Sequence, residues 1–314
     1  PRSTPLYSSA ASDVYKRQAF DTCYTLSLPE GHRFPMEKYD LLATQLLLEG
    51  TAQKDDFFCP TKASIESVQM VHFPLYVEKL INLQLDRSEI RKIGFPLSPE
   101  LIEREFIIAG GTLQGCEMAL DTGVAMNIAG GTHHAYAQRG EAFCLLNDQA
   151  IAAQNLLNQG LVKKVLIVDL DVHQGNGTAS IFCNNPDVFT FSMHGAKNFP
   201  FKKEQSDLDL ALEDGTSSKE YLTILKKTLP ELIEKVKPDF IFYLSGVDVL
   251  KTDKLGRLGL SIEGCKERDA FVFELCKEKE IAVQCSMGGG YSKDINIIVE
   301  AHSNTYRLAK EIFT

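Results

Sequence analysis

The chain has 314 residues, of which 44% are hydrophobic and 24% charged, ordinary values for one or two globular domains. Its formal net charge of -9 at pH 7 argues against a nucleic-acid-binding surface, because such surfaces usually carry a basic face. No apolar run approaches the roughly 18 residues that span a bilayer, so the sequence predicts neither a nucleic-acid-binding nor a membrane protein.

The first segment, residues 1–18, is rich in Ser, Ala and Pro and shows no hydrophobic period. Residues 8–18 also resemble translated sequencing-adapter sequence. We interpret 1–18 as a non-native or disordered leader and 19–314 as the folded domain. A first strand of the native chain would then be missing.

Strand and helix signals alternate from residue 19 onward. Helical periodicity prevails over residues 36–50, 61–83 and 98–122, and again over 147–159, 218–236, 261–280 and 292–313. Apolar runs predict buried strands at 124–129, 164–170, 188–193, 239–244 and 281–286. This alternation predicts a single α/β domain, with one open parallel sheet and helices on both faces. Ligands of such sheets bind beyond the carboxyl ends of the strands.

The eight cysteines contain no Cys-x-x-Cys pair, and several lie in apolar segments. This pattern favours reduced thiols in a cytosolic protein over a disulfide framework. We therefore predict a cytoplasmic location. The acidic balance would suit a cationic substrate, although it more often serves solubility.

The strongest site signal follows the strand predicted at 164–170. Asp171 and His173 are two residues apart, so their side chains share a face of an extended segment. They would supply two of the three protein ligands of an open catalytic zinc site. Asp169 lies on the same face, where it would orient a histidine or hold a second ion. Helix capping explains one such carboxylate, but not two with a histidine.

Asp248 follows the strand predicted at 239–244. A lone aspartate in this position usually forms a turn or a helix cap. Because it stands at another carboxyl strand end, together with Asp171 and His173 it becomes the natural third metal ligand.

Two further clusters follow strands. His133 and His134 come after two glycines and could supply a general base and a partner for a leaving amine, although a single histidine is more often structural. The run Met-Gly-Gly-Gly-Tyr at 287–291 ends in Tyr291. This tyrosine either packs after a helix-entry turn or donates to a carbonyl oxygen that becomes an oxyanion.

The four clusters occur in the order and spacing of the histone-deacetylase-like zinc amidohydrolases, and the resemblance covers nearly all of 20–313. The motifs Gly-His-Arg-Phe-Pro-Met at 31–36 and Asp-Val-His-Gln-Gly-Asn-Gly at 171–177 are similar to the class-IV-like and bacterial branch. The resemblance implies the arginase/deacetylase fold, with 19–314 as the catalytic domain. Residues 71–76 resemble a family helix motif, which makes His72 structural.

The resemblance implies a metal set and a potassium site. Zn²⁺, or Fe²⁺ in vivo, would be held by Asp171, His173 and Asp248. The residues placed to contribute to the family's potassium site are Asp169, Asp171, His173, Ser192 and Met193.

The resemblance also implies the catalytic roles. His134 would be the general base and then the acid for the leaving amine, and His133 would tune the site electrostatically. Asp169 matches the position behind the first histidine and Asn176 the position behind the second, where many members carry Asp. A neutral partner should lower the basicity of that imidazole. Tyr291 would polarise the carbonyl.

For the acyl tunnel, Phe143 matches a family wall aromatic, Phe199 is the candidate for the opposite wall, and Gly289 borders it. Flat apolar walls would suit the methylene stem of a lysine. Ala142 stands where the family usually has Gly, which would either narrow the rim or cost a close backbone contact. Arg33 either approaches the acyl end or is simply exposed.

We therefore expect a zinc-dependent deacylase acting on acyl-lysine in a protein or peptide, or on an acylated polyamine or other small amine. One alternative is a non-catalytic acyl-lysine-binding or scaffold protein, which loss of Tyr291 or a zinc ligand would favour, but neither is lost. The other is a ureohydrolase of the same fold, whose additional paired aspartates are missing after His173 and Asp248. Acyl-chain length and oligomeric state are left open.

Overall fold

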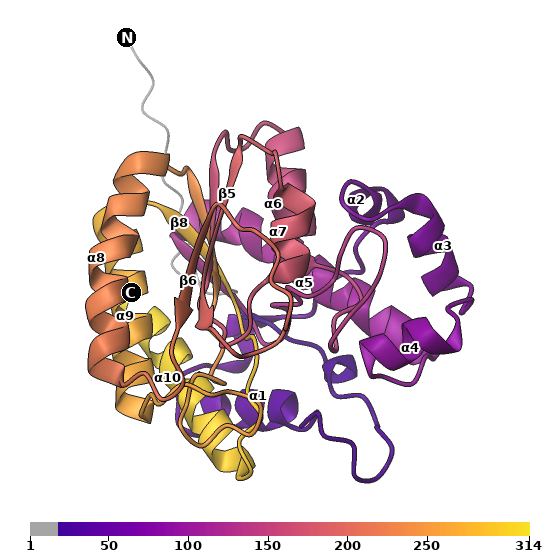
Figure 1. Ribbon diagram of the computed structural model, residues 1–314, viewed down its shortest axis with the longest axis horizontal. Coiled ribbons are helices and arrows are strands. Elements are labelled where there is room, and N and C mark those ends of the chain that lie inside the picture. Colours follow the sequence, from indigo (N-terminus) through magenta and orange to yellow (C-terminus); the bar gives the residue numbers. More distant parts are fainter. Residues whose placement is uncertain (1–17) are drawn as a thin grey trace.

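The structure is a computed structural model that describes residues 18–314 (Figure 1). Eight parallel strands form one sheet in the order β2-β1-β3-β8-β7-β4-β5-β6. The predicted single α/β domain on an open parallel sheet is therefore confirmed. The leader predicted at 1–18 lies outside the described residues except for Gln18, which pairs with Phe57 and Met126 in the sheet.

The strands are β1 Gln18–Ala19, β2 Phe57–Phe58, β3 Val124–Asn127, β4 Val165–Asp169, β5 Val188–Gly195, β6 Leu208–Leu212, β7 Phe240–Leu244 and β8 Ala282–Ser286. Five of them fall within the predicted apolar runs or overlap them. The sequence analysis missed β1 and β2, which are too short to show a period, and β6, a half-exposed strand at the sheet edge.

The α-helices are α1 Lys38–Leu48, α2 Ile65–Gln69, α3 Pro74–Ile81, α4 Arg87–Ile93, α5 Pro99–Thr122, α6 Asp148–Asn158, α7 Asn176–Phe182, α8 Ser218–Val236, α9 Ile262–Glu278 and α10 Ile295–Phe313. The helix predicted at 61–83 is divided into α2 and α3, because Phe73 before Pro74 is extended rather than helical. The short helices α4 and α7 were not predicted.

The helices cover both faces of the sheet. Figure 1 shows α8, α9 and α10 on one side and α5, α6 and α7 on the other. The central strands β4 and β7 are buried along their whole length, which explains their continuous apolar sequences. Within residues 18–314, no helix is both long and apolar enough to cross a lipid bilayer.

The strand order places the predicted site. Strands β3, β8, β7 and β4 are neighbours in the middle of the sheet, and they run parallel. Each is followed directly by one of the four polar clusters, so the clusters meet at one edge although up to about half the chain separates them. This is the edge where open parallel sheets bind ligands.

Candidate active site

Three predicted metal ligands converge at the carboxyl ends of β4 and β7. The ligand atoms of Asp171, His173 and Asp248 all lie within 4.8 Å of one another. Nδ1 of His173 is 3.0 Å from Oδ1 of Asp171 and 3.2 Å from Oδ2 of Asp248. All three side chains are buried. It is the one such group of three among the described residues.

These side chains fit a divalent cation. Oδ2 of Asp248 is buried and accepts no hydrogen bond from the described residues. Burial, together with the negative charge of Asp171, raises the pKa of Asp248 to about 7. A cation between the carboxylates would offset both the burial and the repulsion. Two carboxylates and an imidazole form the three-ligand set that leaves a position open on catalytic zinc.

Backbone N–H groups hold the second oxygen of each carboxylate. The N–H of Val172 donates to Oδ1 of Asp248 over 2.9 Å, and the N–H of Gly289 donates to Oδ2 of Asp171 over 2.9 Å. A Cβ on residue 289 would lie 2.7 Å from Oδ2 of Asp171 and would overlap Oδ2 of Asp248. Gly289 therefore lets the loop after β8 close over the metal ligands, and it also lines the pocket beside them.

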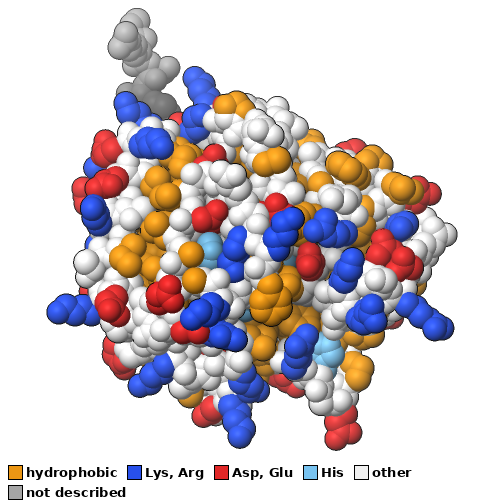
Figure 2. Space-filling model, viewed as in Figure 1, with side chains coloured by type: hydrophobic (Ala, Val, Ile, Leu, Met, Phe, Trp, Pro, Cys, Tyr) orange, Lys and Arg blue, Asp and Glu red, His pale blue; other side chains and the backbone are white. Residues whose placement is uncertain are grey.

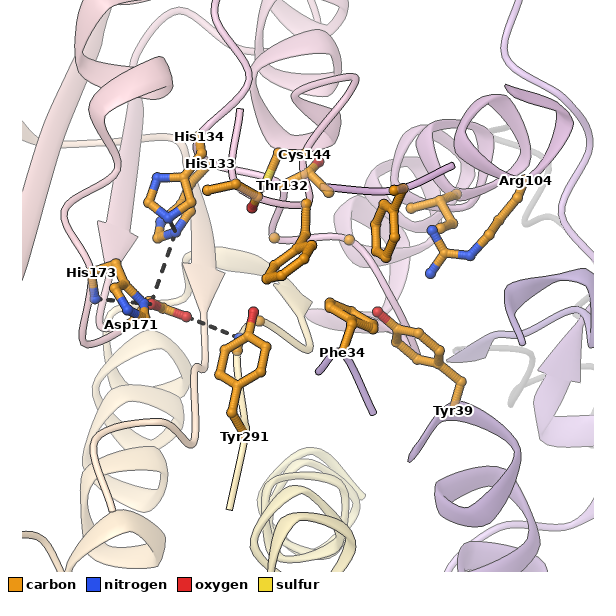
Figure 3. Close-up of a pocket in the computed structure, with 18 residues that line it drawn as sticks. Phe34, Tyr39, Arg104, Thr132, His133, His134, Cys144, Asp171, His173 and Tyr291 are labelled. Carbon is orange, nitrogen blue, oxygen red and sulfur yellow. Dashed lines mark hydrogen bonds and ion pairs between the residues drawn. The ribbon is translucent and has the colours of Figure 1, made fainter. Parts of the chain in front are cut away.

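The two histidines, which lie next to each other in the pocket (Figure 3), form a directed hydrogen-bonded chain with Asp169 and Asn176. Nδ1 of His133 lies 2.7 Å from Oδ2 of Asp169, and Nδ1 of His134 lies 2.6 Å from Oδ1 of Asn176. Because Oδ1 of an amide only accepts, Nδ1 of His134 carries the proton and donates it. In the neutral ring the lone pair is then on Nε2, which is 3.1 Å from Nε2 of His133.

The two imidazoles differ in proton affinity. Burial alone would lower the pKa of His133, but the carboxylates of Asp169 and Asp171 raise it above its ordinary value. Burial, and then the positive charges of His133 and His173, hold the pKa of His134 well below its ordinary value. His134 is thus the neutral member of the pair and the one able to accept a proton.

Tyr291 reaches the same pocket from the loop after β8. Its backbone N–H donates to Oδ2 of Asp253 over 2.6 Å, and its ring centroid lies 5.9 Å from that of Phe34. Burial, with the nearby carboxylates of Asp248 and Asp171, raises the pKa of its hydroxyl well above the ordinary value. The hydroxyl therefore keeps its proton and remains a donor.

Two connected cavities meet at this site. The residues shared by both linings are His134, Ala142, Phe143, His173 and Tyr291. In Figure 3, Tyr39 and Arg104 lie at the end of the inner cavity opposite the metal ligands. Phe143 and Phe199, the two predicted wall aromatics, both line the outer cavity, and the ring of Phe199 is 5.0 Å from that of His134.

At the rim of the outer cavity, Ala142 has a strained backbone conformation. Ala142 and Phe143 have φ angles of 45° and 67°, in the left-handed region that favours glycine. Their N–H groups donate to the carbonyls of Lys92 and Ile93, over 2.9 and 2.6 Å. These bonds fix the tunnel wall to the last turn of α4. The conformation accounts for the preference for glycine at 142 that the resemblance implies.

The sequence profile of the histone deacetylase domain matches residues 32–305. The chain belongs to the histone deacetylase family. An uncharacterized bacterial protein of Picosynechococcus sp. is 43% identical over 290 residues, covering 92% of this chain and 97% of the relative. Histone deacetylase 2 of Arabidopsis thaliana is 27% identical over 311 residues, covering 95% and 79%. The first of these agrees with the predicted resemblance to the bacterial branch.

The fold is likewise that of the family. A crystal structure of the HDA15 HD domain superimposes with a TM-score of 0.80 at 20% sequence identity, covering 96% of this chain and 89% of the other. Family and fold together support a deacetylase or deacylase, a hydrolase of amides.

The sequence analysis of this histone deacetylase family member missed one residue next to the site, Lys38. It is buried, and its Nζ donates to the carbonyl of Gly288 over 3.2 Å and lies 5.5 Å from the ring of Tyr291. Burial lowers its pKa to about 8, against the opposing pull of Asp248 and Asp171. Lys38 thus supports the glycine loop from behind. Its one signal was its closeness to the motif at 31–36.

Other predicted residues have different places. Arg33 lies at the outer mouth, with its guanidinium carbon 5.5 Å above the ring of Phe143, and not at the inner end.

His72 links two loops, since it contacts the carbonyl of Tyr136 and accepts from the N–H of Asn147. Ser192 pairs with Asp169 across β4 and β5, and its hydroxyl lies 3.0 Å from Nδ1 of His194. The potassium site, with Met193, stays a prediction.

Proposed function

We propose that the protein is a zinc-dependent deacylase that hydrolyses the amide of an acyl-lysine, or of an acylated polyamine or other small amine. One observation carries this proposal. Asp171 and His173 of the buried Asp-His-Asp group line one pocket with Tyr291 and with His134, whose Nε2 is unprotonated (Figure 3). Membership of the histone deacetylase family supports the same reaction. Fe²⁺ in place of Zn²⁺ in vivo, a structural K⁺ and a cytoplasmic location belong to the proposal.

When bound by Asp171, His173 and Asp248, the cation would polarise the acyl carbonyl and lower the pKa of a water. His134 accepts the proton of the attacking water at Nε2, while its Nδ1–H remains on Asn176. The Tyr291 hydroxyl donates to the carbonyl oxygen as negative charge develops there. The proton on His134 then passes to the departing amine, which leaves a carboxylic acid and an amine.

The outer cavity supports a substrate with a slender stem. Phe143 and Phe199 line it with aromatic faces, and the shared residues where it meets the inner cavity include both His134 and Tyr291. The methylene chain of a lysine or a polyamine fits apolar walls and presents one amide at its end.

Removal of the metal tests the proposal directly. A zinc chelator is expected to abolish hydrolysis of acyl-lysine peptides by the purified protein and to lower its Tm, since a ligand that binds only the folded state stabilises it by about 2.7 kcal/mol at 100 times its Kd. Added Zn²⁺ should restore both. Turnover that persists in excess chelator contradicts the metal mechanism. Folded, zinc-loaded protein that hydrolyses no acyl chain length would favour the acyl-lysine-binding alternative.

Asn176→Asp is expected to shift the acidic limb of the kcat/KM profile to higher pH. A carboxylate facing Nδ1 favours protonated His134, so the pKa of His134 rises and the neutral base becomes populated only at higher pH. The matched control is Asn158→Asp, which adds the same charge at an exposed position at the end of α6 and should leave the limb in place. An unshifted limb in the Asn176 variant would remove His134 as the titrating base.

A further inference from the structure

The outer mouth of the pocket has the opposite charge to the chain as a whole. Five cationic side chains and only one anionic side chain, Glu141, line the cavity that leads to His134 and Tyr291. The cations are all exposed and are Arg33, Arg91, Lys92, Lys197 and Arg257. The net charge of the chain is -9. A cationic substrate, which the overall composition would suit, therefore meets a mouth of its own sign.

Three of these cations are free to bind an anion. Arg257 lies 3.3 Å from Asp214, and Lys197 lies 3.7 Å from the same carboxylate, so these two are partly neutralised. Glu141 faces Arg139 at 3.6 Å. Arg33, Arg91 and Lys92, in contrast, form no ion pair with any residue from 18 to 314.

Their position relative to the tunnel is fixed by the backbone. Arg91 and Lys92 occupy the last turn of α4, and the carbonyls of Lys92 and Ile93 accept hydrogen bonds from the tunnel wall at 142 and 143. Arg33, which comes from the N-terminal segment at 31–36, lies over the ring of Phe143. Basic residues at a helix C-terminus also offset the helix dipole. That accounts for Arg91 and Lys92, but not for three further cations from other segments.

The face in Figure 2 shows Lys and Arg side chains predominating around a central area of hydrophobic and histidine side chains. Phe201, which is 91% exposed, lines the same mouth and adds apolar surface there. A lysine stem that places its amide beside His134 would leave the peptide backbone and the neighbouring side chains at this mouth.

We infer that the substrate is an acyl-lysine flanked by acidic residues in a protein or peptide, with the flanking carboxylates bound by Arg33, Arg91 and Lys92. This inference rests on the proposed deacylase function and selects within it. Acylated polyamines are disfavoured, because their remaining ammonium groups would lie against the cations of the mouth. The charges of the mouth would affect which substrate binds and how fast it associates, and not the rate of the chemical step.

Peptides with one acyl-lysine and either acidic, neutral or basic flanks test this, alongside an acetylated polyamine. The value of kcat/KM should fall in that order, by about 10-fold from acidic to basic flanks at low salt, since each exposed ion pair contributes only about 2- to 5-fold. The preference should shrink as NaCl is raised towards about 0.5 M, because salt screens exposed charges.

Arg91→Glu combined with Lys92→Glu should reverse the order of acidic and basic peptides. The readout is the ratio of two kcat/KM values in one preparation, so a partial loss of folded enzyme cancels. The matched control, Lys219→Glu with Lys227→Glu, makes the same charge change at exposed positions of α8 and should keep the original order.

Each outcome is decisive. Turnover without preference, preference for basic flanks or the polyamine, or a preference unaffected by salt would overturn the inference while leaving the deacylase in place. Faster hydrolysis of free acyl-lysine than of any peptide would overturn the peptide assignment. If zinc-loaded protein hydrolyses none of these substrates, the proposed function itself fails, and the inference fails with it. Should the double variant not fold, the salt dependence of the wild-type ratio decides.

Discussion

Asp248→Ala is expected to lose bound zinc and at least about 10³-fold in turnover, because metal polarisation of a carbonyl is worth several kcal/mol and about 1.4 kcal/mol is tenfold in rate. Oδ2 of Asp248 has no other hydrogen-bond partner among the described residues and faces the other two ligands. The other two members of the group, Asp171 and His173, are already ligands and cannot supply the missing one. Metal content of the purified variant and its turnover are the measurements.

Alanine at 248 also removes a hydrogen-bond acceptor. In the wild-type protein, Oδ1 of Asp248 accepts from the backbone N–H of Val172 over 2.9 Å. Asp248→Asn is therefore the matched control for folding, since an amide oxygen can still accept that hydrogen bond without supplying the negative charge. Both variants should be folded by circular dichroism and poor in zinc. A folded Asp248→Ala protein with full zinc occupancy would exclude Asp248 as a ligand.

Tyr291→Phe should reduce kcat by about 10²- to 10³-fold, equivalent to about 2.7–4 kcal/mol, the usual effect of deleting one oxyanion donor. Zinc content and Tm should change little. The reason is that Tyr291 is anchored by its backbone N–H to Asp253 and by ring packing on Phe34 and Phe143, all of which phenylalanine retains. Steady-state kinetics should show most of the loss in kcat rather than in KM, since the donor acts in the transition state.

The matched control is Tyr221→Phe. Its hydroxyl is buried on α8, away from the pocket, and makes no hydrogen bond to a described residue, so its removal should leave kcat within about twofold. Activity of Tyr291→Phe within the same range would exclude the phenol as the oxyanion donor. A parallel loss of zinc would instead make Tyr291 a support of the metal loop.

The local sequence determined the elements and the chemistry of the site. Continuous apolar runs predicted five of the eight strands, because a strand buried on both faces carries mostly apolar side chains. The polar clusters directly after these runs, from His133 to Tyr291, are short-range patterns that survive without knowledge of the fold. The resemblance to the histone deacetylases rested on the same segments, and for that reason it could be recognised from the chain alone.

Only the tertiary structure decided how these segments meet. Strand order is set by pairing between residues that are distant in the sequence, up to 159 positions for Val124 and Val283, which no local period records. The strands β1, β2 and β6 exist only because neighbouring strands pair with them. The contact of Gly289 with two carboxylates and the position of Lys38 behind the glycine loop follow from it.

The distribution of charge is the clearest property that the sequence alone could not predict. Composition gives a sum of -9, whereas the fold gathers Arg33, Arg91 and Lys92 from two separate segments at one mouth. A net charge is a property of the chain, but the field that a substrate meets depends on where the charges lie in space.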